Sequence, residues 1–358
     1  MPPLKVAIIG AGPVGCILAR LLFRGGVDVI VFEGEASFNF RDQGGTLDLH
    51  TTTGLLAMKE ADLWQEFLEH ARYEGQSMVI ADKHCKAYLK RAPSGAADKL
   101  EERPEIDRVT LRRILLESLP ADMIKWGHRL AEVDDNKVLH FMDGTTADGF
   151  DLIVGADGAW SKVRDFLDPH LKPQFAQVGM FAFKTENLKD TIPDAYRFVN
   201  HGSVFSHADG IRTSMQELGD GGLSMSVAFV TDSDKWMDPA WTLEEAQQEA
   251  LKKLDGWASV YTEGIAKSES FMARSLYQLP VGSSWVHREG VTLAGDSAHL
   301  MTPFAGEGVN IGMEDARILA TRILDVTKGD SNMTTLNEQV QVYEKLVCQG
   351  QNDTETDR

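Results

Sequence analysis

Three glycines and one glutamate near the start of the chain have the types and spacing of a nucleotide-binding turn. Gly10, Gly12 and Gly15 follow the apolar run VAII, and Glu33 ends a second apolar run, 18 residues after Gly15. In such a turn Gly10 permits the tight bend, Gly12 lets the backbone approach a pyrophosphate, and Gly15 lets a helix pack closely on its strand. Glu33 lies near the position of the acid that binds a ribose hydroxyl. The pattern predicts a dinucleotide site and suits NAD and FAD equally.

The helix that follows this turn, with Pro13 in its first turn, would present unpaired N–H groups and a positive dipole end to the phosphates. An alternative is an α/β domain whose glycines serve packing alone. Packing alone would not require an acid at the end of the second strand.

Two later segments also carry side chains suited to a cofactor. In GADGAWSKVR, Asp157 stands between two glycines at the end of an apolar strand, and Arg164 can neutralise charge. On its own, Asp157-Gly158 is also an ordinary turn. In GDSAHLMTPFAGEGVNIGMEDA, Asp296 ends a strand and suits a polyol hydroxyl. There His299 is either a base or, more commonly, a histidine hydrogen-bonded in place.

Gly306 and Gly308 precede a helix that we expect to start near Val309. Bare N–H groups at that helix N-terminus would stabilise an electron-rich ligand edge. We therefore expect the cofactor to bind at the carboxyl ends of the strands, beside the glycine turns.

These motifs have to be positioned by an interleaved chain. Residues 4–33 predict a βαβ unit, Asp107 is expected to cap an amphipathic helix, and 151–164 return as another buried strand and turn. Short alternating runs over 173–285 predict an antiparallel sheet with one ligand-facing or solvated side. A helix is expected near 309–326 and a last one near 336–347.

Composition limits the partners. The 358 residues carry 54 acidic against 36 basic side chains, a formal net charge of −18, which argues against nucleic acid and anionic membrane surfaces as partners. The three cysteines have no paired spacing, so neither disulfides nor a metal site is expected, and a reducing, cytoplasmic location is the simplest inference. No apolar stretch approaches the roughly 18 residues of a transmembrane helix, and the glycine motif argues against a cleaved signal peptide.

The ordered set GAGPVG with Glu33, GADGAWSKVR and GDSAHLMTPFAGEGVNIGMEDA resembles the class A FAD-dependent monooxygenases, the para-hydroxybenzoate hydroxylase family. RDQGGTLDLH and PEIDRVTLRRILL further resemble the tetracycline-inactivating FAD monooxygenases. The resemblance implies an α/β fold. It would comprise a three-layer, Rossmann-like FAD-binding domain (1–172 and 286–330), an inserted, mainly antiparallel substrate sheet (173–285) and a C-terminal helix and tail (331–358).

The resemblance also assigns residues to cofactors. The ADP half of FAD is assigned to Gly10, Gly12, Pro13, Gly15 and Glu33. Further FAD contacts are assigned to Asp48, Arg112, Asp157 and Asp296, and the flavin ring is expected along Gly306, Gly308, Val309 and Asn310. Arg41 matches an NADPH contact.

The implied reaction is reduction of FAD by NADPH, oxygen addition at flavin C4a to give a hydroperoxide, and hydroxylation or epoxidation of an aromatic, enolic or polyketide-like molecule. The cofactor carries that chemistry, so we assign no catalytic side chain and no metal. The alternatives are a flavin-dependent dehydrogenase or reductase that inserts no oxygen, and an FAD-binding protein with impaired catalysis. A monomer acting on a small molecule and O2 is expected.

Two departures from the tetracycline-inactivating enzymes stand out. Lys184 and Ser224 occupy positions where those enzymes have an amide and an imidazole, which argues against tetracycline as the substrate. The long C-terminal helix of those relatives is expected to be cut short here after Val347.

Overall fold

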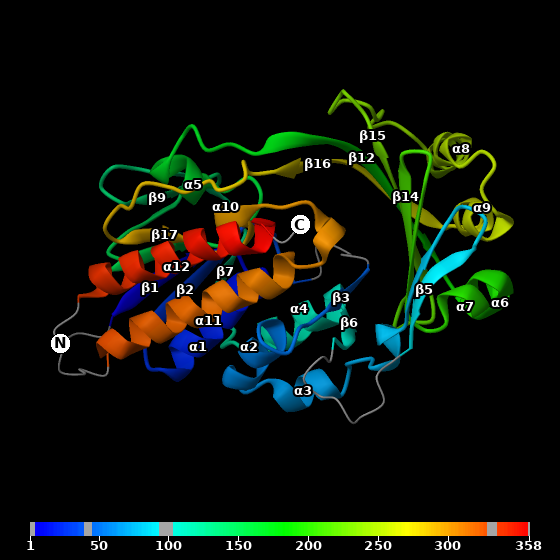
Figure 1. Cartoon of the computed structure of the whole chain (residues 1–358). Coiled ribbons are helices and arrows are strands. Elements are labelled where there is room, and N and C mark those ends of the chain that lie inside the picture. Colours follow the sequence, from blue (N-terminus) through cyan, green and yellow to red (C-terminus); the bar gives the residue numbers. More distant parts are fainter. Residues whose placement is uncertain (1–3, 39–44, 93–102, 328–334, 357–358) are drawn as a thin grey trace.

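The computed structural model describes residues 4–38, 45–92, 103–327 and 335–356, the last eight by backbone only. A parallel sheet with its helices forms one half of the molecule and a large, mainly antiparallel sheet forms the other (Figure 1). Among the described residues, no helix has the combination of length and apolar character needed to cross a membrane.

The parallel sheet is built as the βαβ pattern predicts. Its strand order is β17-β11-β1-β2-β7, with every neighbouring pair parallel. The bounds are β1 (Lys5–Ile9), β2 (Asp28–Glu33), β7 (Ile124–Trp126), β11 (Leu152–Gly155) and β17 (Val291–Leu293). The carboxyl ends of β1, β11 and β17 therefore meet at one edge, where an open parallel sheet binds its ligands.

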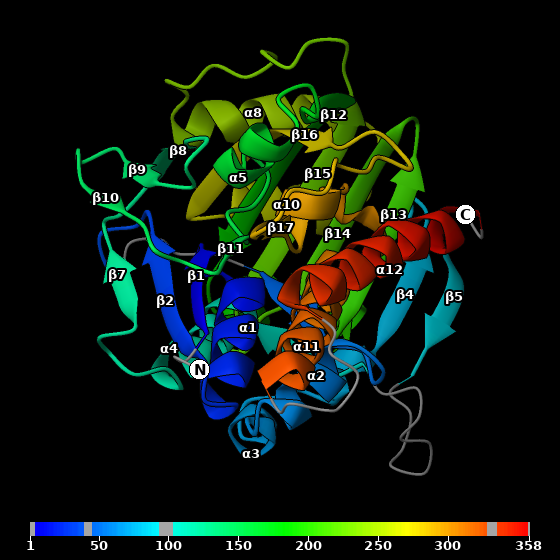
Figure 2. The ribbon, with the colours of Figure 1, turned by 90° about the vertical axis from the view of Figure 1, so that its left-hand side faces the viewer.

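Helices cover the parallel sheet. α1 (Pro13–Arg24) packs against α11 (Gly308–Thr327), which lies beside α12 (Leu336–Thr356; Figure 2). The expected end of the last helix near residue 347 is wrong, because α12 continues to Thr356. The remaining helices of this half are α2 (Gly54–Glu60), α3 (Trp64–Leu68), α4 (Arg108–Glu117), α5 (Lys162–Leu167) and α10 (Asp296–His299).

The large sheet has seven strands in the order β16-β12-β15-β14-β13-β4-β5. They are β4 (Met78–Ala81), β5 (Ala87–Arg91), β12 (Gln174–Thr185), β13 (Ser203–Ala208), β14 (Ile211–Glu217), β15 (Leu223–Val230) and β16 (Ser270–Gln278). Only β4 and β13 pair in parallel. β4 and β5 lie outside the range 173–285 expected for this sheet. Their pairing with β13 joins segments more than a hundred residues apart, which leaves no local signal in the sequence.

One face of the large sheet carries its own core. Phe181, Phe183, Met215 and Met225 are buried there with side chains from the helices that cover this face. Those helices are α6 (Leu188–Thr191), α7 (Pro193–Val199), α8 (Leu243–Lys253) and α9 (Ser259–Ala266). The opposite face looks toward the parallel sheet.

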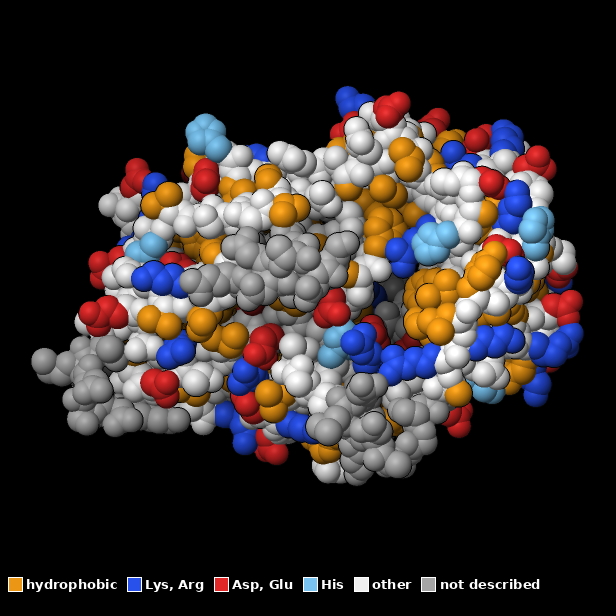
Figure 3. All heavy atoms as spheres, viewed as in Figure 1, with side chains coloured by type: hydrophobic (Ala, Val, Ile, Leu, Met, Phe, Trp, Pro, Cys, Tyr) orange, Lys and Arg blue, Asp and Glu red, His pale blue; other side chains and the backbone are white. Residues whose placement is uncertain are grey.

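Two small sheets complete the fold. β3 (Thr46–Asp48) pairs with β6 (Glu105–Asp107), and β8 (Leu130–Val133), β9 (Leu139–Phe141) and β10 (Thr146–Ala147) form an antiparallel sheet. The space-filling view shows a hollow between the two halves of the molecule (Figure 3). The face of the large sheet that lacks helices forms one wall of this hollow. The other wall contains the loop before α11, because the guanidinium of Arg212 on β14 donates to the carbonyl oxygen of Phe304.

Candidate cofactor and substrate site

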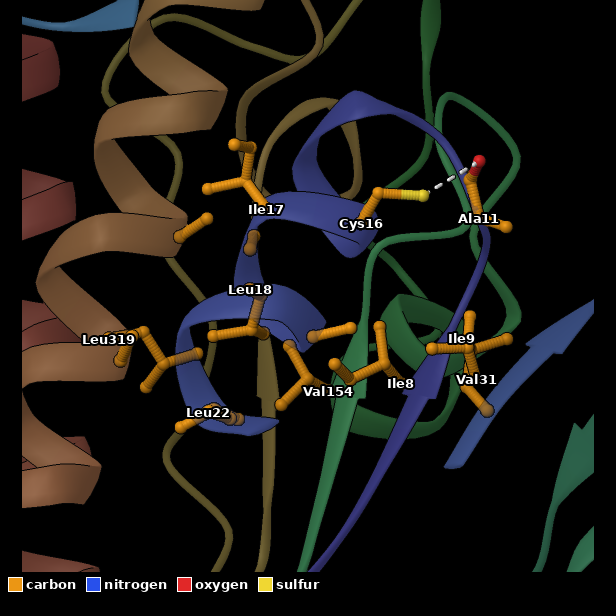
Figure 4. Packing of buried hydrophobic residues seen from close by; sticks show 14 of the residues in the cluster. Ile8, Ile9, Ala11, Cys16, Ile17, Leu18, Leu22, Val31, Val154 and Leu319 are labelled. Atoms are coloured by element: carbon orange, nitrogen blue, oxygen red, sulfur yellow. Dashed lines mark hydrogen bonds between the residues drawn. The ribbon is translucent and has the colours of Figure 1, made fainter. Parts of the chain in front are cut away.

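The three glycines of the first turn have different surroundings. A Cβ on Gly10, where φ is +108°, would lie 2.3 Å from the carbonyl oxygen of Ala156, and one on Gly15 would lie 2.0 Å from that of Gly10. A Cβ on Gly12 would meet no described atom within 4 Å. Gly10 and Gly15 thus let three segments approach closely, and Gly12 borders open space at the start of α1. Behind this turn, Leu18 of α1 packs beside Val154 of β11 and Leu319 of α11 (Figure 4).

The N-terminus of α1 is available to an anion. Gly12 is the N-cap, Pro13 is in the first turn, and no described side chain caps the helix. Behind it, the carboxylate of Glu33 accepts from the backbone N–H of Ala11 over 2.7 Å and from that of Glu35 over 2.8 Å. Free N–H groups, open space and a fixed acid at the end of β2 are what the ADP half of FAD requires. The residues present therefore fit the cofactor.

Arg112 lies on α4, beside the carboxylate of Glu35. It is buried and donates to the carboxylate of Glu35 over 2.5 Å. We missed Glu35 in the sequence, although an acid two residues beyond Glu33 was a visible signal. The assignment of Arg112 to FAD stays a prediction.

Asp107, immediately before α4, does not cap that helix as expected. Its carboxylate instead accepts from the backbone N–H of Gly219 and from Arg72. Gly219 follows β14, so this acid connects the two halves of the molecule.

The GADG and GDSAH segments meet at the ends of β11 and β17. The hydroxyl of Ser297 donates to Asp157 over 3.1 Å and accepts from the backbone N–H of Gly158 over 2.9 Å. Arg164 is buried and donates to the carbonyl oxygens of Ala159 and Ser297, among others. Arg164 therefore braces the two loops, and Asp157 faces the junction between them.

Asp296 is exposed to solvent, yet desolvation by the surrounding protein raises the pKa of its carboxyl. Its Oδ1 lies 4.0 Å from where a Cβ on Gly308 would be, beside the start of α11. The charges of His299, Arg108 and Arg164 oppose this rise. Asp296 thus stands in the hollow, as a contact to a cofactor hydroxyl would require.

His299 is held in place rather than presented to the hollow. Its Nε2 lies 2.5 Å from the carboxylate of Asp315, and both side chains are buried. Desolvation works to lower the pKa of His299, but the charge and hydrogen bond of Asp315 outweigh it and raise that pKa. Asp315 also accepts from the backbone N–H of Gly295 over 2.8 Å. The pair fixes the turn that carries Asp296.

The start of α11 lies between two carboxylates. A Cβ on Gly306 would lie 3.7 Å from Oδ1 of Asp48, and one on Gly308 would lie 4.0 Å from Oδ1 of Asp296. Negative charge beside a helix N-terminus is favourable. The predicted glycine loop, Asp48 and Asp296 therefore do come together around one space.

The side chain of Asn310 does not line that space. It is fully buried, and its amide donates to the carbonyl oxygen of Asp48 and accepts from the backbone N–H of His50. Val309 precedes it, partly buried, at the open end of the helix. Arg41, the predicted NADPH contact, lies outside the described residues.

The face of the large sheet that lacks helices, its bare face, lies against the glycine loop before α11. Lys184 and Ser224 are direct cross-strand neighbours, and the Ser224 hydroxyl lies 4.0 Å from where a Cβ on Gly45 would be. Phe304, before Gly306, packs against Met180 and Ala228 of the sheet. Lys184 pairs with Asp220 over 2.9 Å. The hollow thus has a glycine loop on one side and a mixed polar and apolar sheet on the other.

Residues 3–344 match the model of the FAD binding domain family. The chain is 31% identical over 359 residues to the FAD-dependent monooxygenase thnD of Trichoderma harzianum, covering 90% of this chain and 83% of that one. The chain belongs to the FAD-dependent monooxygenases. It is also 27% identical over 396 residues to the monooxygenase penA of Penicillium thymicola, covering 96% and 89% of the two chains.

Solved structures agree with this fold. The 2,6-dihydroxypyridine-3-hydroxylase of Arthrobacter nicotinovorans superposes with a TM-score of 0.81 at 18% identity, over 98% of this chain and 89% of that one. The tetracycline destructase Tet(51) superposes with a TM-score of 0.70 at 21% identity, over 99% and 89%. The family resemblance and the fold class expected from the sequence are both confirmed.

Proposed function

We propose that this flavoprotein monooxygenase takes electrons from NADPH and inserts one atom of O2 into a planar, electron-rich small molecule bound in the hollow. The observation that carries the proposal is the convergence of the α11 glycine loop, Asp48 and Asp296 opposite the bare face of the large sheet. When bound, FAD would accept the hydride and would activate oxygen at its C4a atom.

The chain's own residues would bind and orient FAD and would shield the site from water. Gly12 and the start of α1 would hold the pyrophosphate, Glu33 the ribose, and Asp296 a ribityl hydroxyl. The N-terminus of α11 would stabilise negative charge on the ring through its dipole. Phe304, which packs on Met180 and Ala228, would exclude water from one side of the hollow.

An aromatic or polyketide-like substrate is supported by the relatives. The salicylate hydroxylase of Pseudomonas putida is 28% identical over 96% of this chain, and a 3-amino-4-hydroxybenzoate 2-monooxygenase of Streptomyces platensis is 25% identical over 88%. Both names describe aromatic acids. The cytoplasmic location and the monomeric state remain predictions from the sequence.

The test is oxygen stoichiometry with the purified, FAD-loaded protein and a panel of aromatic and polyketide-like compounds. We expect a compound that accelerates NADPH oxidation to consume O2 in equal amount and to yield a product carrying labelled oxygen. NADPH oxidation that reduces a substrate without consuming O2 would favour the dehydrogenase or reductase. Protein that takes up FAD but never oxidises NADPH would favour an FAD-binding protein with impaired catalysis.

A further inference from the structure

Two arginines from the two halves of the molecule lie in the hollow without an acidic partner. Arg108 is the first residue of α4, and Arg274 lies on β16. Both are exposed, and within the described part of the chain the side chain of neither makes a hydrogen bond or ion pair. Most guanidinium groups near this site are paired, as Arg112 is with Glu35. The two free ones therefore need a separate explanation.

The register of the large sheet shows where Arg274 points. Arg274 pairs with Met180, Met180 with Ala228, and Ala228 with Arg212. Directly paired residues place their side chains on the same face of a sheet. Met180 and Ala228 pack against Phe304 of the glycine loop, so this row faces the expected position of the flavin.

Arg212, at the other end of this row, is already fixed. Its guanidinium donates to the carbonyl oxygen of Phe304 over 3.2 Å and lies 4.7 Å from the centre of that ring. The row thus offers an apolar floor, Met180 and Ala228, with one engaged and one free guanidinium at its two ends.

Arg108 and Arg274 also act on each other. Desolvation lowers the pKa of both guanidinium groups, and the positive charge of Arg274 lowers that of Arg108 further. The carboxylate of Asp296 acts on Arg108 from beyond ion-pair distance. Geometry also places Arg108 at the large sheet, because its Nε lies 3.9 Å, and the Ser224 hydroxyl 4.0 Å, from where a Cβ on Gly45 would be. Two like charges at one site favour the binding of an anion between them.

We propose that Arg108 and Arg274 together bind an ionised acidic group of the substrate, a carboxylate or an ionised enol, while its ring lies over Met180 and Ala228 beside Phe304. This proposal rests on the proposed function, because it places the substrate in the same hollow. Paired guanidinium groups suit an oxyanion, since each offers a fork of N–H donors. Phosphate of the cofactor is the alternative anion.

The test is calorimetric titration of the FAD-loaded protein at neutral pH with two matched pairs of ligands. The first pair is salicylate and salicylamide, and the second is 4-hydroxycoumarin and coumarin. In the parent protein we expect at least one acid to bind more tightly than its neutral partner. In R274Q we expect that acid to bind roughly 10- to 100-fold more weakly, with the neutral partner unchanged. The first pair reports a carboxylate and the second an ionised enol.

R197Q is the matched control, since Arg197 lies on α7, on the helix-covered side of the same sheet. It should bind every ligand as the parent does. R274K should retain part of the affinity lost in R274Q, because it keeps the charge without the fork.

The proposal is overturned if neither acid binds more tightly than its neutral partner, or if R274Q weakens acid and neutral ligands alike. Loss of FAD from R274Q with an unchanged unfolding temperature would assign the pair to a cofactor phosphate and overturn it too. Failure of the proposed function looks different: the parent protein would fail to take up FAD, or would bind the acids without oxidising NADPH.

Discussion

The side-chain amide of Asn310 donates to the carbonyl oxygen of Asp48 over 2.8 Å, joining residues 262 positions apart in the chain. Its amide oxygen accepts from the backbone N–H of His50 over 2.8 Å. One buried side chain thus attaches the start of α11 to β3. This attachment holds Asp48 beside the start of α11.

Asn310→Ala should therefore weaken the attachment of α11 to β3. Two buried backbone groups would lose their partners, which typically costs roughly 1–3 kcal/mol of unfolding free energy. We also expect weaker retention of FAD, measured by the flavin released on dilution and gel filtration. Asn136→Ala, at an exposed turn, is the control and should change neither quantity. Unaltered stability of the Asn310 variant would show that the attachment is dispensable.

Alanine at positions 12 and 15 should affect different properties, FAD affinity at Gly12 and folding stability at Gly15. Gly15→Ala brings a methyl group to 2.0 Å from a backbone oxygen, so the FAD-free protein should lose at least about 2 kcal/mol of stability. Gly12→Ala meets no described atom, and its φ of −75° suits alanine. It should therefore fold normally but bind FAD roughly tenfold more weakly.

Denaturant unfolding of the FAD-free variants and fluorescence titration with FAD separate the two effects. Each glycine variant serves as the control for the other. If Gly12→Ala bound FAD as tightly as the parent protein, the pyrophosphate would lie elsewhere.

The sequence predicted the elements whose signals are local. The βαβ unit, the strand before Asp157 and the loop before α11 all rest on apolar runs and glycines within 30 residues or fewer of each other, and each is present. The addition of β4 and β5 to the large sheet was not predictable in this way. It depends on a parallel pairing with β13 that no short-range periodicity encodes.

The direction of individual side chains was the other feature that the sequence did not predict. Asn310 was expected along the flavin ring, and its side chain is buried against the backbone of Asp48 and His50. The carboxylate of Asp107 was expected to cap α4, and it accepts from the backbone N–H of Gly219 instead. Arg274 was not singled out at all. Its place in the hollow follows from the register of β16 against β12, which a single sequence does not give.

If Asp296 binds a cofactor hydroxyl as proposed, Asp296→Ala should lower FAD retention roughly tenfold, because that charged hydrogen bond would be lost. Asp325→Ala, on the exposed side of α11, is the matched control. The ratio of flavin to protein absorbance after gel filtration measures the effect. A flavin content equal to that of the parent protein would remove Asp296 from the cofactor site.

Glu105 should make stability depend on pH. Its buried carboxyl accepts from Thr46 of β3 and Ser203 of β13, and burial raises its pKa from 4.5 to about 7, with Arg72 opposing the shift. Between these values the folded protein holds a proton that the unfolded chain releases. This group's contribution to stability is therefore present below about pH 4.5 and is lost as the pH rises to about 7.

Glu105→Gln keeps the shape of the side chain and removes its titration. The stability of the variant relative to the parent protein should therefore rise by about 3 kcal/mol between pH 4.5 and pH 8. Urea unfolding at several pH values measures this difference. Glu66→Gln, on the surface helix α3, should show no such change with pH. A constant difference between Glu105→Gln and the parent protein would mean that Glu105 is ionised in the folded state throughout this range.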